Sequence, residues 1–148
     1  MKQVITIYTI EQAQLYKYVC LLLSKLYLQK YRMLVLMQDK TKAQELDNLL
    51  WTFSQQSFIP HALVDDDFQG QHPIVITWIN TLATNFDTLV MVENFIALDF
   101  NEFDRVMLFC THNSQVNEAQ KLVKQFNKEI KINYYTYNQK GTWDHQNL

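Results

Sequence analysis

Short apolar runs alternate along this chain with longer stretches whose apolar residues recur at helical spacing. The run YRMLVLMQD at 31–39 has a continuous apolar centre, as expected for a strand that is buried on both faces of a sheet. In the stretch before it, Leu15, Val19, Leu23 and Leu26 fall on one face of a helix, together with Leu22. Strands that alternate with amphipathic helices are typical of α/β folds with an open, largely parallel sheet.

The pattern predicts the following elements. The expected strands cover 3–10, 31–39, 73–78, 87–93, 104–110 and 130–137. The expected helices cover 11–30, 39–51 and 113–129, and Asn113 or Ser114 can cap the last of them. Residues 138–148 are interpreted as a polar tail with one Trp. A chain of 148 residues fits one domain, so we expect a single α/β domain over 1–148, with helices on both faces of the sheet.

Charge and hydropathy limit the partners. The net charge is −2, which argues against a general nucleic-acid binder, so we expect little direct DNA binding. The start MKQVITIYTIEQ has too short an apolar run for a signal peptide. No apolar run approaches the roughly 18 residues that a membrane helix needs. We therefore expect a cytoplasmic protein with no membrane partner.

The glycines exclude the usual nucleotide site of such a sheet. A loop that cradles phosphate needs glycine so that the backbone can approach the anion. The chain has only Gly70 and Gly141, and neither lies between a predicted strand and the helix that follows it. The sequence thus predicts a Rossmann-like fold without a nucleotide-binding loop, and no cofactor.

Residues that could carry chemistry are scattered. No pair of histidines has metal-ligand spacing, and we expect no metal site. His61 is interpreted as a structural hydrogen-bonding residue, with catalysis as the alternative. Cys110 and His112 could form a nucleophile pair, but nothing supplies an orienting group, and both Cys20 and Cys110 read as small buried hydrophobes. The acidic run at 65–67 is either a cation site or, more commonly, a solvated loop. We expect no catalytic residue.

The stretch from 46 to 78 carries an unusual set of residues in fixed order. It contains LDNLLW, SFIPH and PIVITW, and in these Leu46, Asp47, Leu50, Trp51, Ser57, Phe58, Pro60, His61, Pro73 and Trp78 match a family pattern in order and spacing. The pattern resembles that of the chi subunit of bacterial DNA polymerase III holoenzyme. The resemblance implies an accessory protein of the clamp-loader complex with no catalysis of its own, which bridges the psi subunit and the C-terminal tail of single-stranded-DNA-binding protein.

The first implied surface binds psi. The family's psi-contact residues fall on Trp51 and Phe58, within a motif that also holds Leu50 and Pro60. Aromatic side chains suit this role because they give a large contact area for little lost rotamer entropy. Leu50 is expected to support the site from below. The alternative is that Trp51 and Phe58 are core residues, as most Trp and Phe are.

The second implied surface binds the acidic, Phe-ended tail. By resemblance it uses the last helix and the preceding strand, with Lys121, Lys124 and Lys128 as cations and Cys110 and Phe126 near the apolar pocket. Lys124 stands where the family has an arginine, and lysine cannot bind a carboxylate bidentately in the same way. The alternative is a solvated lysine face.

A different class of function also remains open at this point. The chain could be a small α/β enzyme that acts on a nucleotide or another small molecule and has lost its glycine loop. Saturable nucleotide binding would favour the enzyme, whereas binding of an acidic peptide that weakens with salt would favour the binding module.

Overall fold

The computed structural model describes residues 3–53, 59–66, 72–79, 85–96, 102–125 and 130–146. The helices in these residues are α1 (Gln12–Leu28), α2 (Lys40–Phe53) and α3 (Asn113–Lys124). The strands are β1 (Gln3–Thr9), β2 (Met33–Leu36), β3 (His61–Leu63), β4 (Ile74–Thr77), β5 (Thr88–Val92), β6 (Arg105–Cys110), β7 (Ile130–Tyr137) and β8 (Trp143–Gln146).

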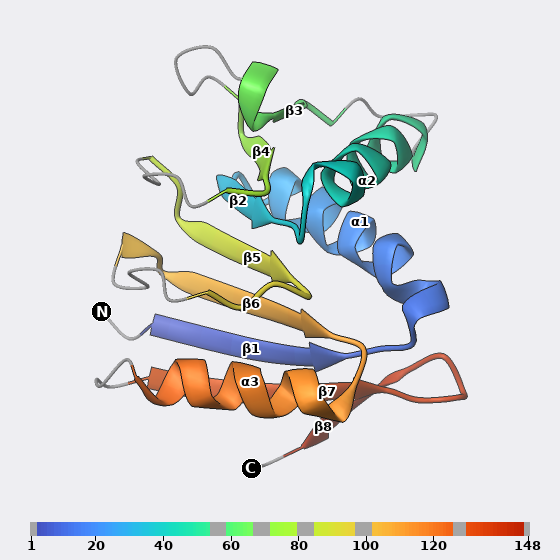
Figure 1. The fold of residues 1–148 in the computed structure, drawn as a ribbon, viewed down its shortest axis with the longest axis vertical. Helices are drawn as coiled ribbons and strands as arrows, with labels where there is room; N and C mark the ends of the chain where they lie inside the picture. The colour runs from blue at the N-terminus through green and yellow to red at the C-terminus, as the bar shows by residue number, and fades with distance from the viewer. Residues whose placement is uncertain are drawn as a thin grey trace.

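The eight strands form one open sheet in the order β3-β4-β2-β5-β6-β1-β7-β8 (Figure 1). Only the β7–β8 pair is antiparallel, and every other neighbouring pair is parallel. From β1 the chain passes through α1 toward β2, and from β6 it passes through α3 in the opposite direction to β7. Because such crossovers are right-handed, the two directions place helices on opposite faces.

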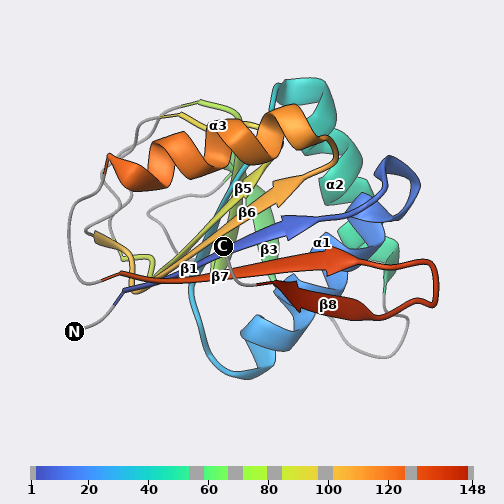
Figure 2. The same cartoon turned by 90° about the horizontal axis from the view of Figure 1, so that it is seen from below.

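Figures 1 and 2 show α1 and α2 on one face of the sheet and α3 on the other. Each face has its own apolar core. Leu15, Val19, Leu23 and Leu26 of α1 are buried in the first, and α3 buries its apolar stripe in the second. The predicted α/β fold, with an open and mostly parallel sheet and helices on both faces, is confirmed.

The central strands are buried as their composition requires. All four residues of β2, all four of β4 and all five of β5 are buried. Strands covered on both faces lose any apolar–polar alternation, which is why these segments read as continuous apolar runs. No helix in the described part of the chain is both long and apolar enough to cross a membrane.

Two strands differ from the sequence prediction. The tail interpreted as polar contains β8, which pairs antiparallel with β7 in the register Tyr137↔Trp143. The turn between them contains Gly141 at φ +82°, a conformation that glycine adopts without a Cβ penalty. The other missed strand is β3, a three-residue edge strand that pairs with β4.

The start of α3 also differs in its cap. Helix α3 begins at Asn113, preceded by His112 in extended conformation, and no side chain caps it at that position. Neither Asn113 nor Ser114 is therefore the N-cap. Instead, the Gln115 side chain points back toward the residues before the helix, and its oxygen accepts a hydrogen bond from the backbone N–H of Thr111 at 2.6 Å. This contact is close to the reciprocal half of a capping box.

Both cysteines are buried and free, as predicted. Cys20 is a residue of α1 and is buried in the core on that face of the sheet, whereas Cys110 ends β6 and is buried in the core under α3. Burial raises the pKa of each thiol to about 12. A reactive cysteine needs the opposite shift, so the Cys110–His112 nucleophile suggested as a possibility by the sequence has no activated thiol here.

Candidate protein-interaction sites

Trp51 lies in the last turn of α2 and is exposed. Its exposed fraction is 51 %, whereas Leu46 and Leu50 on the inward side of the same helix are 0 % and 2 % exposed. The helical period separates these roles, since positions 46 and 50 share a face that Trp51 leaves. Leu50 is therefore a core residue and presents almost no surface to a partner. Phe58, the second predicted aromatic, lies outside the described residues.

Trp51 is held in place by polar groups beneath it. Asp47 lies one turn earlier on α2, and its carboxylate accepts a hydrogen bond from the Trp51 side chain. The ring of His61, the first residue of β3, lies 4.5 Å from the Trp51 ring, centre to centre. The motif residues Asp47, Trp51 and His61, from one helix and one strand, thus form a single contact group.

His61 and Asp47 face each other next to Trp51. The Nδ1 atom of His61 lies 2.7 Å from the carbonyl oxygen of Ile59, which only accepts, so Nδ1 carries a proton. Nε2 lies 3.3 Å from Asp47 Oδ1, without hydrogen-bond alignment, and the His61 side chain is 0 % exposed. A neutral ring would present a lone pair to a carboxylate there, so the pair is favourable only with a second proton on one of the two groups.

The surroundings of Asp47 favour holding that proton. Burial raises the pKa of the Asp47 carboxyl, the nearby Asp66 adds to the effect, and His61 and the Trp51 hydrogen bond oppose it. The predicted structural role of His61 is consistent with these contacts. Its ring joins the end of α2 to the start of β3.

A small hollow of about 290 Å³ opens beside Trp51. Pro60, Leu63 and His72 contribute to its lining together with the Asp47–His61 pair. Pro60 is half-buried, at the rim of the site. An exposed ring next to a lined hollow is a suitable anchor for a protein partner, because buried aromatic anchors dominate interface energies.

The predicted cationic surface lies on α3, on the opposite face of the sheet. Lys121 and Lys124 are exposed in its last turn, three positions apart, and neither is ion-paired within the described residues. Cys110 is 0 % exposed below the helix, so its thiol belongs to the floor of this region. Phe126 and Lys128 lie outside the described residues.

The carboxyl ends of β5 and β6 carry a carboxylate where related folds bind phosphate. The connections that follow β6 and β1 run in opposite directions along the sheet, and open α/β sheets bind ligands at such a switch point. Here Glu93 accepts hydrogen bonds from Thr111 Oγ1 at 2.9 Å and Gln115 Nε2 at 3.0 Å, next to the N-terminus of α3. A fixed negative charge there repels phosphate, in agreement with the missing glycines.

The acidic run at 65–67 forms no ligand cluster in the part that the structure describes. Asp65 and Asp66 are exposed in a short 3-10 helix (Val64–Asp66), and Asp65 pairs with Lys40 at 3.8 Å. Asp67 lies outside the described residues. Within the described ranges, no group of three His, Cys, Asp or Glu side chains could hold a metal ion.

The sequence prediction gave Asp47 no role. Two signals could have found it. Asp47 stands four positions before Trp51, the spacing at which helical side chains meet, and it belongs to the same motif as His61. The contact between the helix residue and the strand residue depends on how α2 packs against β3, and the missed strand hid it.

Comparison with known proteins identifies the family of the chain. A sequence model of the family described as DNA polymerase III chi subunit, HolC, matches residues 1–130. "Probable DNA polymerase III subunit chi" of Rickettsia prowazekii (strain Madrid E) is 25 % identical over 154 residues, which cover 96 % of this chain and 91 % of that protein. "DNA polymerase III subunit chi" of Escherichia coli (strain K12) is 25 % identical over 91 residues, 61 % of this chain and 62 % of that protein. Since the family match spans most of the chain, the chain belongs to the family of DNA polymerase III chi subunits, accessory subunits of the replication polymerase.

Proposed function

We propose that this protein is a non-catalytic bridge within the clamp-loader complex, which binds the psi subunit through Trp51 and the C-terminal tail of single-stranded-DNA-binding protein through α3. The observation that carries the proposal is the half-exposed Trp51 ring next to the buried His61 and the partly buried Asp47. A surface ring with a dedicated polar support is pre-organised for a partner, because less side-chain entropy is lost on binding.

The α3 face supports the second contact. Lys121 and Lys124 add their charge to the C-terminus of a helix, where the dipole also favours cations. Both ammonium groups are free of ion pairs within the described residues and are available to the carboxylates of an acidic tail. Because the two sites lie on opposite faces of the sheet, one molecule can hold both partners at once (Figure 2).

The psi contact is tested by co-purification with psi after the double change Trp51→Ala and Phe58→Ala. The expected result is a folded protein that no longer retains psi, since each aromatic anchor contributes about 2 kcal/mol or more. Leu28→Ala is the matched control, because Leu28 is a 76 % exposed apolar side chain on α1, away from the motif. Unfolding of the double variant would show that the two rings are core residues.

The tail contact is tested by titration with an acidic peptide that ends in Phe. Lys124→Glu should weaken binding, and added salt should weaken it further. Lys25→Glu places the same charge change on α1 and is the control. If Lys25→Glu abolishes binding and Lys124→Glu does not, the tail binds on the α1 face and the α3 assignment is wrong.

A further inference from the structure

The sheet face that carries α1 and α2 is only partly covered. These helices pack over β2, β4 and β5, while β1, β7 and β8 continue past α1 on the same face (Figures 1 and 2). Between α1 and these strands lies a cavity of about 620 Å³. Small-molecule sites in proteins typically measure about 300–1,000 Å³, so the cavity is large enough to hold a ligand.

One part of the cavity is walled by fixed aromatic rings. Tyr8 of β1 stacks on Phe109 of β6, with ring centres 4.7 Å apart and planes within 13°. The Trp143 ring meets Tyr8 edge-on at 5.3 Å and also meets Tyr18 of α1 at 5.7 Å. The Tyr18 hydroxyl lies 2.6 Å from that of Tyr137, which fixes α1 to the hairpin. Tyr135 of β7 stacks on Tyr8 as well, with ring centres 5.8 Å apart. The wall is therefore built from both layers, and it offers apolar ring edges against which an aromatic ligand can pack.

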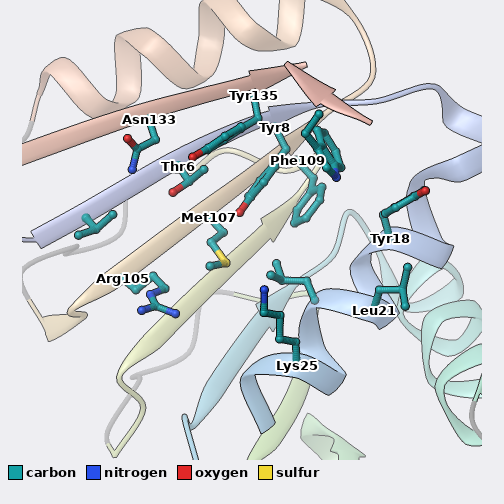
Figure 3. A pocket seen from close by; sticks show the side chains of 13 residues that line it. Thr6, Tyr8, Tyr18, Leu21, Lys25, Arg105, Met107, Phe109, Asn133 and Tyr135 are labelled. Carbon is teal, nitrogen blue, oxygen red and sulfur yellow. The ribbon is translucent and has the colours of Figure 1, made fainter. Parts of the chain in front are cut away.

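The other part of the cavity carries two cations. Arg105 at the start of β6 and Lys25 on α1 lie below the Tyr8 and Phe109 rings as drawn in Figure 3. The Arg105 guanidinium donates to the Tyr31 hydroxyl at 3.1 Å and lies over the Tyr31 ring at 4.4 Å, which orients it. Neither cation forms an ion pair within the described residues, and no Asp or Glu is among the lining residues.

The rings and the cations lie at different ends of the same strand. Phe109 stands four positions after Arg105, so their Cα atoms are about 13 Å apart along β6, and the long Arg105 and Lys25 side chains can bring their charges nearer to the rings. Asn133 of β7 and the buried Thr6 of β1 supply polar groups on the floor between them. Burial raises the pKa of Tyr8 to about 12, so its hydroxyl stays neutral and can donate a hydrogen bond.

We propose that this cavity binds a small aromatic anion, whose ring packs against Tyr8 and Trp143 and whose carboxylate or phosphate is bound by Arg105 and Lys25. Charge complementarity decides the choice of ligand, because in the described part of the chain Arg105 and Lys25 have no ion pair and the lining has no carboxylate. The site needs no glycine loop, since side chains make the contacts. It is separate from Trp51 and from the α3 lysines, and it does not depend on either partner.

The ligand class is tested by calorimetric titration of the whole protein with matched probes. We expect 1-naphthyl phosphate and 1-naphthaleneacetate to bind, while 1-naphthol, which lacks the charge, and inorganic phosphate, which lacks the ring, bind at least about tenfold more weakly. Thymidine monophosphate serves as a further probe to distinguish a natural phosphate ligand from a carboxylate ligand. If it binds as well as naphthyl phosphate, the natural anion is a phosphate, and if only naphthaleneacetate binds, it is a carboxylate.

Variants locate the binding. Lys25 is exposed, so Lys25→Gln should keep the fold, and we expect it to lower the affinity for naphthyl phosphate about fivefold. Arg105→Gln should lower this affinity about tenfold or more, because Arg105 is partly buried. Leu21→Trp should block the cavity without changing its charge, since Leu21 lines it and is 42 % exposed. Lys42→Gln on α2 is the control and should leave the affinity unchanged.

Four results would overturn the proposal. The first is equal affinity for naphthol and naphthyl phosphate. The second is the absence of binding by every aromatic anion at about 1 mM. The third is an unchanged affinity in Lys25→Gln and Leu21→Trp. Displacement of naphthyl phosphate by the acidic Phe-ended peptide would also overturn it, because the occupant would then be a protein tail.

Discussion

Trp51 and the lysine pair on α3 are both exposed, but the protein holds them in different ways. The Trp51 ring rests on Asp47 and His61, two polar groups that a helix and a strand bring together. Lys121 and Lys124 project from one regular helix, with no ion pair to fix them within the described residues. The first arrangement suits a shaped contact with one partner, and the second suits electrostatic attraction that tolerates a flexible one.

The difference has an energetic consequence. The groups that support the exposed ring are themselves removed from water, His61 fully and Asp47 in part, and removing polar groups from water costs free energy. Exposed lysines carry no such cost, since solvent surrounds the charge. Changes around Trp51 should therefore affect both stability and binding, while changes in the lysines should affect binding alone.

The largest expected effect separates Leu50 from its neighbour. Leu50→Ala should lower the free energy of unfolding by about 2–5 kcal/mol, because a buried leucine leaves a cavity. Trp51→Ala should lower it by less than about 1 kcal/mol, since half of that side chain is exposed. Urea unfolding of both variants is the measurement. Equal losses of unfolding free energy would mean that Trp51 is a structural residue like Leu50, which would contradict its role as a surface anchor.

The next effect concerns the support itself. Asp47→Ala should weaken psi binding about tenfold, because the Trp51 ring loses its hydrogen-bond acceptor and His61 loses its partner. A double-mutant cycle with Trp51→Ala should give a coupling of about 1 kcal/mol. Asp47→Asn keeps an acceptor oxygen for the indole and should restore part of the affinity. Additive losses would show that Asp47 does not act through Trp51.

A smaller effect should appear on α3. Lys121→Gln and Lys124→Gln should each lower the affinity for the acidic peptide by up to about fivefold, which is the range for an exposed charge pair. Each should also reduce the salt dependence measured between about 50 and 200 mM, because fewer charges remain to be screened. Psi binding at Trp51 should change little over the same range. A steep salt dependence of binding at both sites would contradict the distinction between a shaped contact at Trp51 and an electrostatic contact on α3.

The smallest effect is a pH dependence at Asp47. Its pKa is raised in the folded protein, so the folded state binds this proton more tightly than the unfolded chain, whose carboxyl titrates near about pH 3.9. The contribution of Asp47 to stability is therefore present at low pH and lost as the pH rises through the folded pKa. The free energy of unfolding of the wild type, minus that of Asp47→Asn, should fall as the pH rises above the unfolded value and through the raised folded pKa.

Because the His61 ring lies against Asp47, its own contribution needs a control. The comparison repeated in a His61→Gln background removes the imidazole from both proteins. The direction should persist there, because His61 lowers the pKa of Asp47 and its removal leaves burial as the main influence. A difference that rises with pH in both backgrounds would contradict the raised pKa.

The sequence predicted the fold well wherever burial controls composition. Continuous apolar runs gave β2, β4 and β5, and helical spacing gave α1 and α2 to within a few residues. It missed β3 and β8, whose residues are strands because of what they pair with. His61–Leu63 is too short to show a period, and Trp143–Gln146 is mostly polar. The Gly141 turn before β8 was a usable signal for a hairpin.

By itself, the sequence determined the layers of this protein, the absence of a glycine loop and the motif that indicates the chi family. Those properties follow from the spacing of apolar residues along the chain and from the positions of particular residue types such as glycine, both of which are local. Only the tertiary structure decided which motif residues touch, because the contact of Asp47 with His61 requires α2 to lie against β3. The same holds for the aromatic cavity, whose rings and cations come from distant strands and from α1, and whose existence depends on the sheet extending beyond the helices that cover it.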